Sequence, residues 1–327
     1  MVAFSEMFHR LNPWSKDSNP ISTTTASLLL VFYALSYFLP FYLSPLTRPS
    51  PTLSRDNPSV IRARIRSVCI SCFCCCLSTF LILLYVADLS VPDGLHYLGL
   101  WPLGLTESAR ALGLTALLFA GPLFLYLVVD DGWKDWVKGY PVKELWGDML
   151  TWRNIVAGPL TEELLFRTSS VPLFLLSSLP VSRIIFYSPV IFGLAHVHHF
   201  YEFRLQNPRV PVFAALLRSV FQFSFTTLFG AYATFVFIRT GSLLAAFAVH
   251  AFCNGMGLPK VWGRVERLDG RGSRLVWTVG YYTLLVGGAV GFWKELWALT
   301  EGGNGLTDAF GRVLLLAIPL KVFGVVV

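Results

Sequence analysis

The sequence NIVAGPLTEELLFRTSSVPLFLL, residues 154–176, has the length and the apolar character of a membrane-crossing helix. A helix needs about 20 predominantly apolar residues to cross the hydrocarbon core of a bilayer. This stretch nevertheless holds Glu162, Glu163 and Arg167. Ionisable groups are costly in hydrocarbon, so they usually mark a functional site there, and a structural ion pair is the main alternative. The stretch therefore predicts a transmembrane helix that carries a polar site inside the membrane.

The composition of the whole chain also indicates an integral membrane protein. Of its 327 residues, 54% are hydrophobic and 14% are charged, whereas about 25% are charged in an ordinary soluble domain. Apolar runs of near-bilayer length recur along the chain, which argues against a soluble protein with a large core. We therefore predict an all-α, polytopic membrane protein with about eight transmembrane helices in one bundle. The expected spans are residues 26–43, 68–86, 111–129, 154–176, 184–197, 212–238, 242–257 and 275–293.

The remaining segments suggest no further domain. Because no internal repeat or linker divides the chain, we expect a single membrane domain over residues 1–327. The polar N-terminal segment, residues 1–24, has no secretory-signal pattern, so the first span is expected to direct insertion. Residues 310–327 are apolar but are interrupted by Arg312, Pro319 and Lys321. This last segment is expected to be either re-entrant or interfacial.

The basic residues predict the orientation of the protein rather than a nucleic-acid site. The net charge is +7, but lysine and arginine gather in the loops after the first, third, fifth and seventh spans. The opposite loops hold little more than Arg110, Arg183 and Arg239. By the positive-inside rule the basic loops are cytoplasmic and the N-terminus faces the lumen. Residues 130–146 place three tryptophans among lysines, which is typical of an interfacial helix.

Five of the six cysteines lie close together in the second span. They are Cys69, Cys72, Cys74, Cys75 and Cys76. A disulfide framework would distribute cysteines along the chain, and a zinc ribbon would need a second cluster. We therefore expect buried free thiols, with palmitoylation of those nearest the membrane surface as the alternative.

Three polar clusters are expected at a similar depth in the membrane. Besides the glutamates of the fourth span, the fifth span ends with His196, and the seventh holds His250 and Asn254. At 1.5 Å per residue, Glu162 lies about 14 Å, His196 about 12 Å and His250 about 15 Å from the cytoplasmic ends of their helices. Unrelated structural residues have no reason to share one depth. The three clusters are therefore expected to converge in the cytoplasmic half of the bundle.

Helical spacing suggests partners within each cluster. Glu163 and Arg167 are four residues apart and are expected to form an ion pair. Glu162 faces away from that arginine, so it is the freer carboxylate and the candidate general base. His250 and Asn254 are also four residues apart and project from one face. That geometry suits two donors to one oxyanion, two metal ligands, or hydrogen bonding between helices.

Two further histidines follow His196 nearer the membrane surface. On a helical wheel, His198 and His199 turn away from His196 by about 200° and about 300°. We therefore expect both to be interfacial and to face away from the site.

At these residues the sequence resembles the type II CAAX prenyl endopeptidases of the Abi family, in their eukaryotic branch. The family pattern combines a Glu-Glu-x-x-x-Arg motif, a Phe-x-x-x-His motif and a His-x-x-x-Asn or Asp motif, each on a membrane helix. Any one motif is weak, whereas all three in this order and at matched depth are specific. The resemblance places the catalytic core helices at residues 153–259. The matching residues are Glu162, Glu163 and Arg167; Phe192 and His196; and His250 and Asn254.

The resemblance implies an intramembrane endopeptidase of the endoplasmic reticulum membrane that opens toward the cytosol. Its implied substrates are farnesylated or geranylgeranylated CaaX proteins such as small GTPases, from which it removes the C-terminal aaX tripeptide. Membrane lipid is the other implied partner, and no metal or other cofactor is expected. Either glutamate remains possible as the base, because neighbouring carboxylates can titrate as a coupled pair. The implied roles are water activation by Glu162 and His196, oxyanion stabilisation by His250 and Asn254, and support by Glu163, Arg167 and Phe192.

Two other functions are compatible with the same residues. A metal-dependent protease would use Glu162, His196 and His250 as zinc ligands, although the chain has no His-Glu-x-x-His motif. A transporter or scaffold with the same fold would use the buried charges as a proton path or as structural pairs. Several spans contain proline, as broken transporter helices do, but no sequence repeat accompanies them.

Overall fold

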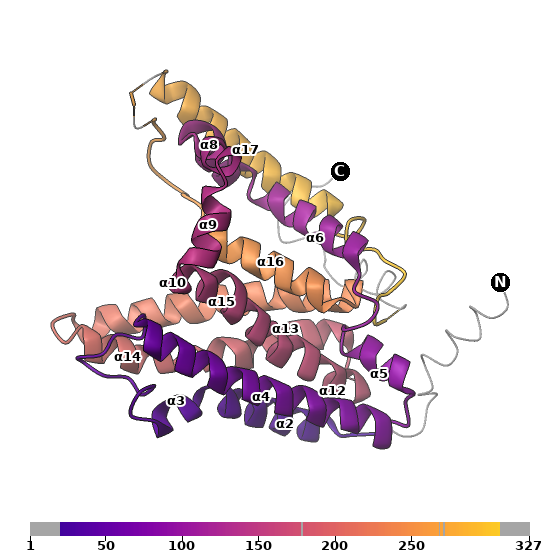
Figure 1. The fold of residues 1–327 in the computed structure, drawn as a ribbon. Coiled ribbons are helices and arrows are strands. Elements are labelled where there is room, and N and C mark those ends of the chain that lie inside the picture. Colours follow the sequence, from indigo (N-terminus) through magenta and orange to yellow (C-terminus); the bar gives the residue numbers. More distant parts are fainter. Residues whose placement is uncertain (1–19, 178, 268, 271, 308–327) are drawn as a thin grey trace.

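The computed structural model describes residues 20–307 except 178, 268 and 271, and the described chain is helical, without strands (Figure 1). Four long, apolar helical segments have the length needed to cross a membrane. They are α2 (Thr23–Phe38) with its short continuation α3 (Pro40–Leu43), α4 (Pro58–Tyr85), α15 (Val212–Thr240) and α17 (Arg274–Glu295). The chain is therefore an all-α, multi-pass membrane protein. Most of residues 1–24 and all of residues 310–327, for which we made separate predictions, lie outside the described part.

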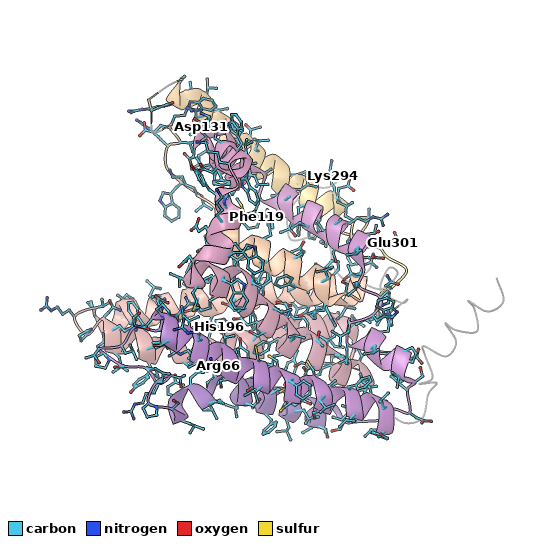
Figure 2. All side chains as sticks on the ribbon, in the orientation of Figure 1. Arg66, Phe119, Asp131, His196, Lys294 and Glu301 are labelled. Carbon is cyan, nitrogen blue, oxygen red and sulfur yellow. The ribbon has the colours of Figure 1, made fainter. Side chains whose placement is uncertain are left out.

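The predicted count of eight spans is not confirmed, although each predicted span coincides with helical structure. The described helices provide four spans, or five if one bent pair is counted as a span. That pair is α6 (Leu105–Leu118) with α7 (Ala120–Phe124) and the π-helical turn η1 (Leu125–Val129), and it bends by 81°. The bend lies at Phe119, which is labelled in Figure 2. Pro122 follows within one turn, and a proline removes one helical hydrogen bond, which favours such a break.

The helices stack in layers (Figure 1). One layer consists of α2 and α4, the next of α13 (Val181–Ala195) and α15, and α16 (Leu243–Met256) lies on α15. The pair α6 and α17 packs beyond α16 and lies far from α2 and α4. A short helix, α5 (Val91–Tyr97), joins α4 to this outer pair. One segment between these layers, residues 153–176, contacts α4, α13 and α16.

This central segment is one helical path with two wide turns. It consists of the π-helical turn η2 (Arg153–Ala157), α11 (Gly158–Glu163), the π-helical turn η3 (Leu164–Ser169) and α12 (Val171–Leu176). In η3 the hydroxyls of Ser169 and Ser170 donate to carbonyls five residues earlier, at 2.8 and 2.7 Å. These bonds help to satisfy backbone groups where the α-helical pattern widens. Isolated π-turns of this kind are frequent at functional sites.

The predicted interfacial helix over residues 130–146 is two short helices in the structure. They are α8 (Gly132–Val137) and α9 (Tyr140–Gly147), followed by the short α10 (Met149–Trp152). Gly139 separates α8 and α9 with φ at 72°, a left-handed conformation that glycine adopts at no steric cost. The three tryptophans of this region remain exposed, as an interfacial position would require.

The cysteine prediction was correct for only one side of α4. Cys72 and Cys75 are buried and Cys76 is half-buried, whereas Cys69 and Cys74 are exposed. All five are free thiols. Five cysteines within eight positions extend around more than one face of a helix, so they cannot all face the protein interior. Cys72 and Cys76 contact carbonyls of the central segment, and Cys75 contacts Ser36 on α2.

Candidate active site

Glu163 joins three helical elements at the centre of the bundle. Its side chain is fully buried, and its Oε1 accepts a hydrogen bond from Arg167 Nη1 at 3.1 Å, which confirms the predicted ion pair. The same Oε1 lies 2.6 Å from His250 Nδ1 on α16. A buried carboxylate needs such partners, because an unpaired charge is costly away from water. Glu163 therefore links the glutamate motif to the histidine of α16, a contact that the sequence did not indicate.

Arg167 anchors the next two helices around the same point. Its Nη2 donates to the carbonyl of Gly230 on α15 at 3.1 Å. Its guanidinium also lies over the ring of Phe192 on α13, 4.7 Å from the centroid, in a cation–π contact. A Cβ at Gly230 would lie 2.8 Å from the Cβ of Pro189 and 3.2 Å from Arg167 Nη2. Only glycine therefore permits this approach of α15.

His196 is fixed by its contacts with α13. The ring packs edge-on against Phe192, with centroids 4.8 Å apart. Its Nδ1 lies 2.8 Å from the carbonyl oxygen of Phe192, and a carbonyl can only accept, so Nδ1 carries the proton. The neutral ring then has Nε2 as its acceptor nitrogen. This is the form that a histidine needs in order to take a proton from water.

Glu162 and Glu163 are neighbours in sequence but lie in different environments. Glu162 keeps 22% of its side-chain surface exposed, whereas Glu163 has none. Glu162 Oε2 lies 3.8 Å from His250 Nε2, so this imidazole lies between the two carboxylates. Glu162 is therefore the carboxylate that contacts the cavity, in agreement with its predicted freedom from Arg167.

Asn254 lies one turn beyond His250 on α16 and reaches the same region. It lines the cavity, and its Nδ2 donates to the backbone carbonyl of Asn154 in η2 at 2.9 Å. One proton of the amide is used in this bond, which leaves the second for another acceptor. His250 lies deeper, 6% exposed, with its Nε2 toward Glu162.

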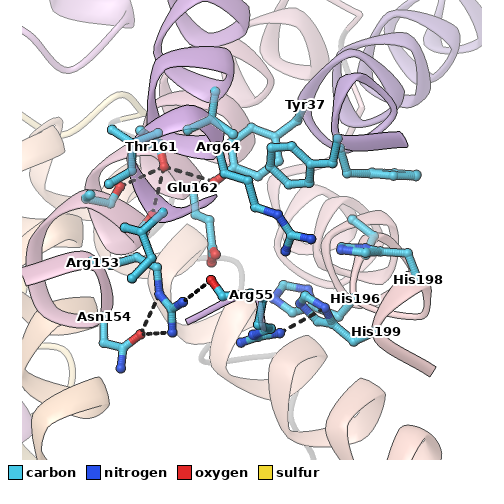
Figure 3. Close-up of a pocket in the computed structure, with 18 of the residues that line it drawn as sticks. Tyr37, Arg55, Arg64, Arg153, Asn154, Thr161, Glu162, His196, His198 and His199 are labelled. Carbon is cyan, nitrogen blue, oxygen red and sulfur yellow. Dashed lines mark hydrogen bonds between the residues drawn. The ribbon is translucent and has the colours of Figure 1, made fainter. Parts of the chain in front are cut away.

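A cavity of about 200 Å³ joins these residues (Figure 3). Its walls come from α2, α4, the central segment, the end of α13, the start of α14 (His198–Gln206) and α16. The predicted residues that line it are Glu162, His196 and Asn254. Several other lining residues were not predicted: Tyr37, Arg55, Arg64, Arg153, His198 and His199.

The prediction that His198 and His199 face away from the site was wrong. Both line the cavity, because α13 ends at Ala195 and α14 begins at His198 in a new direction. A helical wheel applies only to a continuous helix, so its angles were misleading here. His198 stacks on Phe38 with ring centroids 5.0 Å apart and an angle of 4° between the planes.

The arginines were missed for a similar reason. We assigned Arg55 and Arg64 to a basic loop. Arg55 does lie before α4, but α4 begins at Pro58, ten residues before the predicted span. Arg64 is therefore a helical residue, and Ile61, Ile65 and Val68 line the same cavity. Their spacing of three to four residues around Arg64 is the signal that would have placed this arginine on the inner face.

Glu202 is the acidic partner of two arginines that line the cavity. Its carboxylate contacts Arg64 Nη2 at 2.8 Å and Arg55 Nη1 at 3.3 Å. Burial alone would raise the pKa of Glu202, but the hydrogen bonds from His199 and Arg64 and the nearby arginine charges lower it well below its usual range. Burial also lowers the pKa of His199 to about 3, against the opposing effect of Glu202. Glu202 is therefore ionised and His199 neutral at physiological pH.

Among the residues that the structure describes, no three His, Cys, Asp or Glu side chains form a group that could hold a metal ion. The residues brought together are instead two carboxylates, two imidazoles and an amide around a cavity. Such a set can activate water and stabilise a developing negative charge.

Comparison with known proteins identifies the family. Residues 145–256 match the model of the type II CAAX prenyl endopeptidase Rce1-like family. The probable CAAX prenyl protease 2 of Schizosaccharomyces pombe is 37% identical over 85% of this chain and 94% of its own length. The CAAX prenyl protease 2 of Arabidopsis thaliana is 31% identical over 87% of this chain and 92% of its own length. The protein of that name from Saccharomyces cerevisiae is 30% identical over 80% of this chain and 92% of its own length.

No solved structure matches the chain. The matched region includes the central segment, α13, α15 and α16, which carry the residues described above. The sequence relationship extends over most of this chain and nearly the whole length of its fungal and plant relatives. The chain therefore belongs to the Rce1-like family of type II CAAX prenyl endopeptidases.

Proposed function

We propose that this protein is an intramembrane endopeptidase that removes the C-terminal aaX tripeptide from prenylated CaaX proteins. The observation that carries the proposal is the position of Glu162, which contacts a membrane-embedded cavity beside His250 and shares that cavity with His196. The relatives named CAAX prenyl protease 2 support the same reaction class. The enzyme is a peptide-bond hydrolase of the glutamate type.

In the proposed reaction, Glu162 and His196 activate a water molecule. One of them takes a proton as the water oxygen forms a bond to the carbonyl carbon of the prenylcysteine. The C–N bond to the first aliphatic residue then breaks, and the departing nitrogen receives a proton. The products are a protein that ends in prenylcysteine carboxylate and a free aaX tripeptide. His196 suits this role because Phe192 fixes its Nδ1 and leaves Nε2 to accept.

His250 and Asn254 are the proposed donors to the oxyanion. Asn254 has one amide proton left after its bond to Asn154. The contact of His250 with Glu163 determines when the second ring nitrogen of His250 can donate. If Nδ1 donates to Glu163, Nε2 can also donate only when both nitrogens carry protons, as in the imidazolium form. The carboxylate of Glu163 lies 2.6 Å from Nδ1, so we propose that Glu163 orients the His250 ring.

The setting of the site fits a substrate that is part lipid and part peptide. The prenyl chain would lie in the membrane between helices while the peptide enters the polar cavity. We place the protein in the endoplasmic reticulum membrane with its cavity open to the cytosol, where farnesylated and geranylgeranylated proteins such as small GTPases are available. The reaction as proposed uses no metal or other cofactor.

Cleavage of a farnesylated CaaX peptide by the purified protein in lipid nanodiscs tests this proposal. We expect release of the aaX tripeptide, with kcat lowered about 100-fold or more in Glu162→Gln and in His196→Ala. The matched control is Glu144→Gln, because Glu144 is exposed on α9 outside the cavity. Full activity of Glu162→Gln would overturn the catalytic assignment. An active wild-type protein that loses activity with a chelator and regains it with zinc would favour a metalloprotease on the same residues.

A further inference from the structure

Several arginines line the cavity. Three arginines line it, namely Arg55, Arg64 and Arg153. Two carboxylates pair with them: Glu202 with Arg55 and Arg64, and Asp56 with Arg153 at 2.8 Å. Glu162 lines the same cavity but forms no ion pair with these arginines within the described part of the chain (Figure 3).

Arg64 is held by several contacts, but not all of its N–H donors are used. Its Nε and Nη2 donate to the carbonyl of Thr47 at 3.1 and 2.8 Å, and Nη2 also contacts Glu202. Its guanidinium lies over the ring of Phe41, 5.0 Å from the centroid. Nη1 makes no hydrogen bond within the described part of the chain. The side chain is only 15% exposed, so this free nitrogen belongs to a pre-organised, largely dehydrated group.

Arg55 is more loosely held. Its Nη1 lies 3.3 Å from both Glu202 Oε2 and His199 Nδ1, and its Nε lies 3.7 Å from Asp56. Its Nη2 has no hydrogen bond to any residue that the structure describes. A guanidinium presents its N–H groups in a planar fork that matches the two oxygens of a carboxylate. Arg55 and Arg64 together thus offer two positively charged groups with unused donors to an anion in the cavity.

The substrate brings one anion that is always present. The aaX segment ends in a free α-carboxylate, three residues beyond the scissile bond, and an extended chain spans at most about 3.6 Å per residue. The carboxylate therefore lies within roughly 11 Å of the reacting carbonyl. Glu162 and the two arginines line the same cavity of about 200 Å³.

We propose that Arg55 and Arg64 bind the free α-carboxylate of the aaX segment and so restrict cleavage to the chain terminus. This inference rests on the proposed function. It assigns the two arginines to binding and positioning of the substrate, whereas Glu162 and His196 carry the chemistry. Glu202 is the internal counter-ion that holds both guanidinium groups in place.

The test compares two farnesylated peptides of identical sequence, one ending in a free carboxylate and one in a carboxamide. Removing a charge-assisted hydrogen bond typically costs about tenfold to a hundredfold. The wild-type protein is expected to prefer the free acid by that factor in kcat/KM, mainly through KM. In Arg55→Gln and Arg64→Gln the preference should shrink toward equality, because only the acid loses an interaction. A merely structural role would lower the cleavage of both peptides alike.

The matched control is Arg66→Gln, because Arg66 is an exposed arginine of the same helix that does not line the cavity. It should retain the full preference for the acid. Arg64→Gln removes the closest partner of Glu202 and can therefore prevent folding. In that case Arg55→Gln remains a valid test of the inference, because Glu202 keeps Arg64 in that variant. Equal cleavage of both peptides by the wild-type protein would overturn the inference and leave the proposed function intact. An undiminished preference for the acid in Arg55→Gln would also overturn it, whereas cleavage of neither peptide would overturn the function itself.

Discussion

Replacing Glu163 by leucine removes the carboxylate that pairs with both Arg167 and His250. Arg167 is 1% exposed, and its remaining partners are the Gly230 carbonyl and the ring of Phe192. Leaving one member of a buried ion pair without its partner typically costs about 3–5 kcal/mol. We expect Glu163→Leu to lower the free energy of unfolding by about that amount, together with loss of activity. The reverse variant, Arg167→Met, should be similarly destabilised, because Glu163 then keeps only the imidazole.

The double variant Glu163→Leu/Arg167→Met separates stability from activity. Glu163 Oε2 and Arg167 Nε have no hydrogen-bond partner among the described residues, so the pair is incompletely satisfied. Replacing such a pair by apolar side chains is often neutral. The double variant should therefore be more stable than either single variant and regain most of the about 3–5 kcal/mol that each of them loses. It should stay inactive, because His250 still lacks its carboxylate.

The measurement is equilibrium unfolding in mixed micelles, with peptide cleavage recorded on the same samples. The control is Glu144→Gln, because Glu144 is an exposed residue of α9 and such surface substitutions change stability little. A Glu163→Leu protein as stable as wild type would refute the reasoning, since Arg167 would then tolerate burial without its carboxylate. Full activity of the double variant would show instead that His250 does not depend on Glu163.

Three further predictions concern packing, pH and metal. Gly230→Ala should lower the thermal midpoint in micelles by several degrees, because its Cβ would meet Pro189 at 2.8 Å; Gly287→Ala, which meets nothing within 4 Å, should not. The pKa of Glu202 is lowered on folding, so its contribution to stability is present above the ordinary value of 4.5 and is lost as pH falls below it. Glu202→Gln should flatten this acid limb in unfolding curves recorded between pH 3 and 7. Exhaustive chelation should leave tripeptide release unchanged in a liquid-chromatography assay, and a loss restored by zinc would contradict this.

The sequence predicted the polar residues of the site better than it predicted their contacts. Loop charge and helix direction placed Glu162, His196 and His250 at one depth, and the structure brings all three to one region. The four-residue spacing of Glu163 and Arg167 gave the ion pair correctly. The contact of Glu163 with His250 could not be predicted in this way, because it joins two helices 87 residues apart. The periodicity of one segment does not show which side chain of another segment it contacts.

The errors in the fold have local causes that hydropathy does not register. Apolar residues continue through residues 111–129, yet the path bends at Phe119, one turn before η1. The start of α4 was placed at Val68, because the arginines before it reduce the hydropathy of a helix that begins at Pro58. Hydropathy finds apolar length, whereas helix ends depend on caps such as Asn57, which accepts from the backbone of Ser59. Arg64, which lines the cavity, is among the residues that this error left outside the predicted helix.

The adjacent glutamates can take different roles because one residue along a helix is a rotation of about 100°. That rotation turns Glu163 into the bundle, where it contacts Arg167 and His250, and turns Glu162 toward the cavity. A carboxylate between a guanidinium and an imidazole is poorly suited to take a proton from water, since both partners stabilise its charge. Among the described residues, the one ion-pair contact of Glu162 is with His250 Nε2, at 3.8 Å. The pairing of Glu163 therefore favours Glu162 as the proposed base. In the same proposal Glu163 has a separate role, because its contact with Nδ1 fixes the orientation of the His250 ring between the two carboxylates.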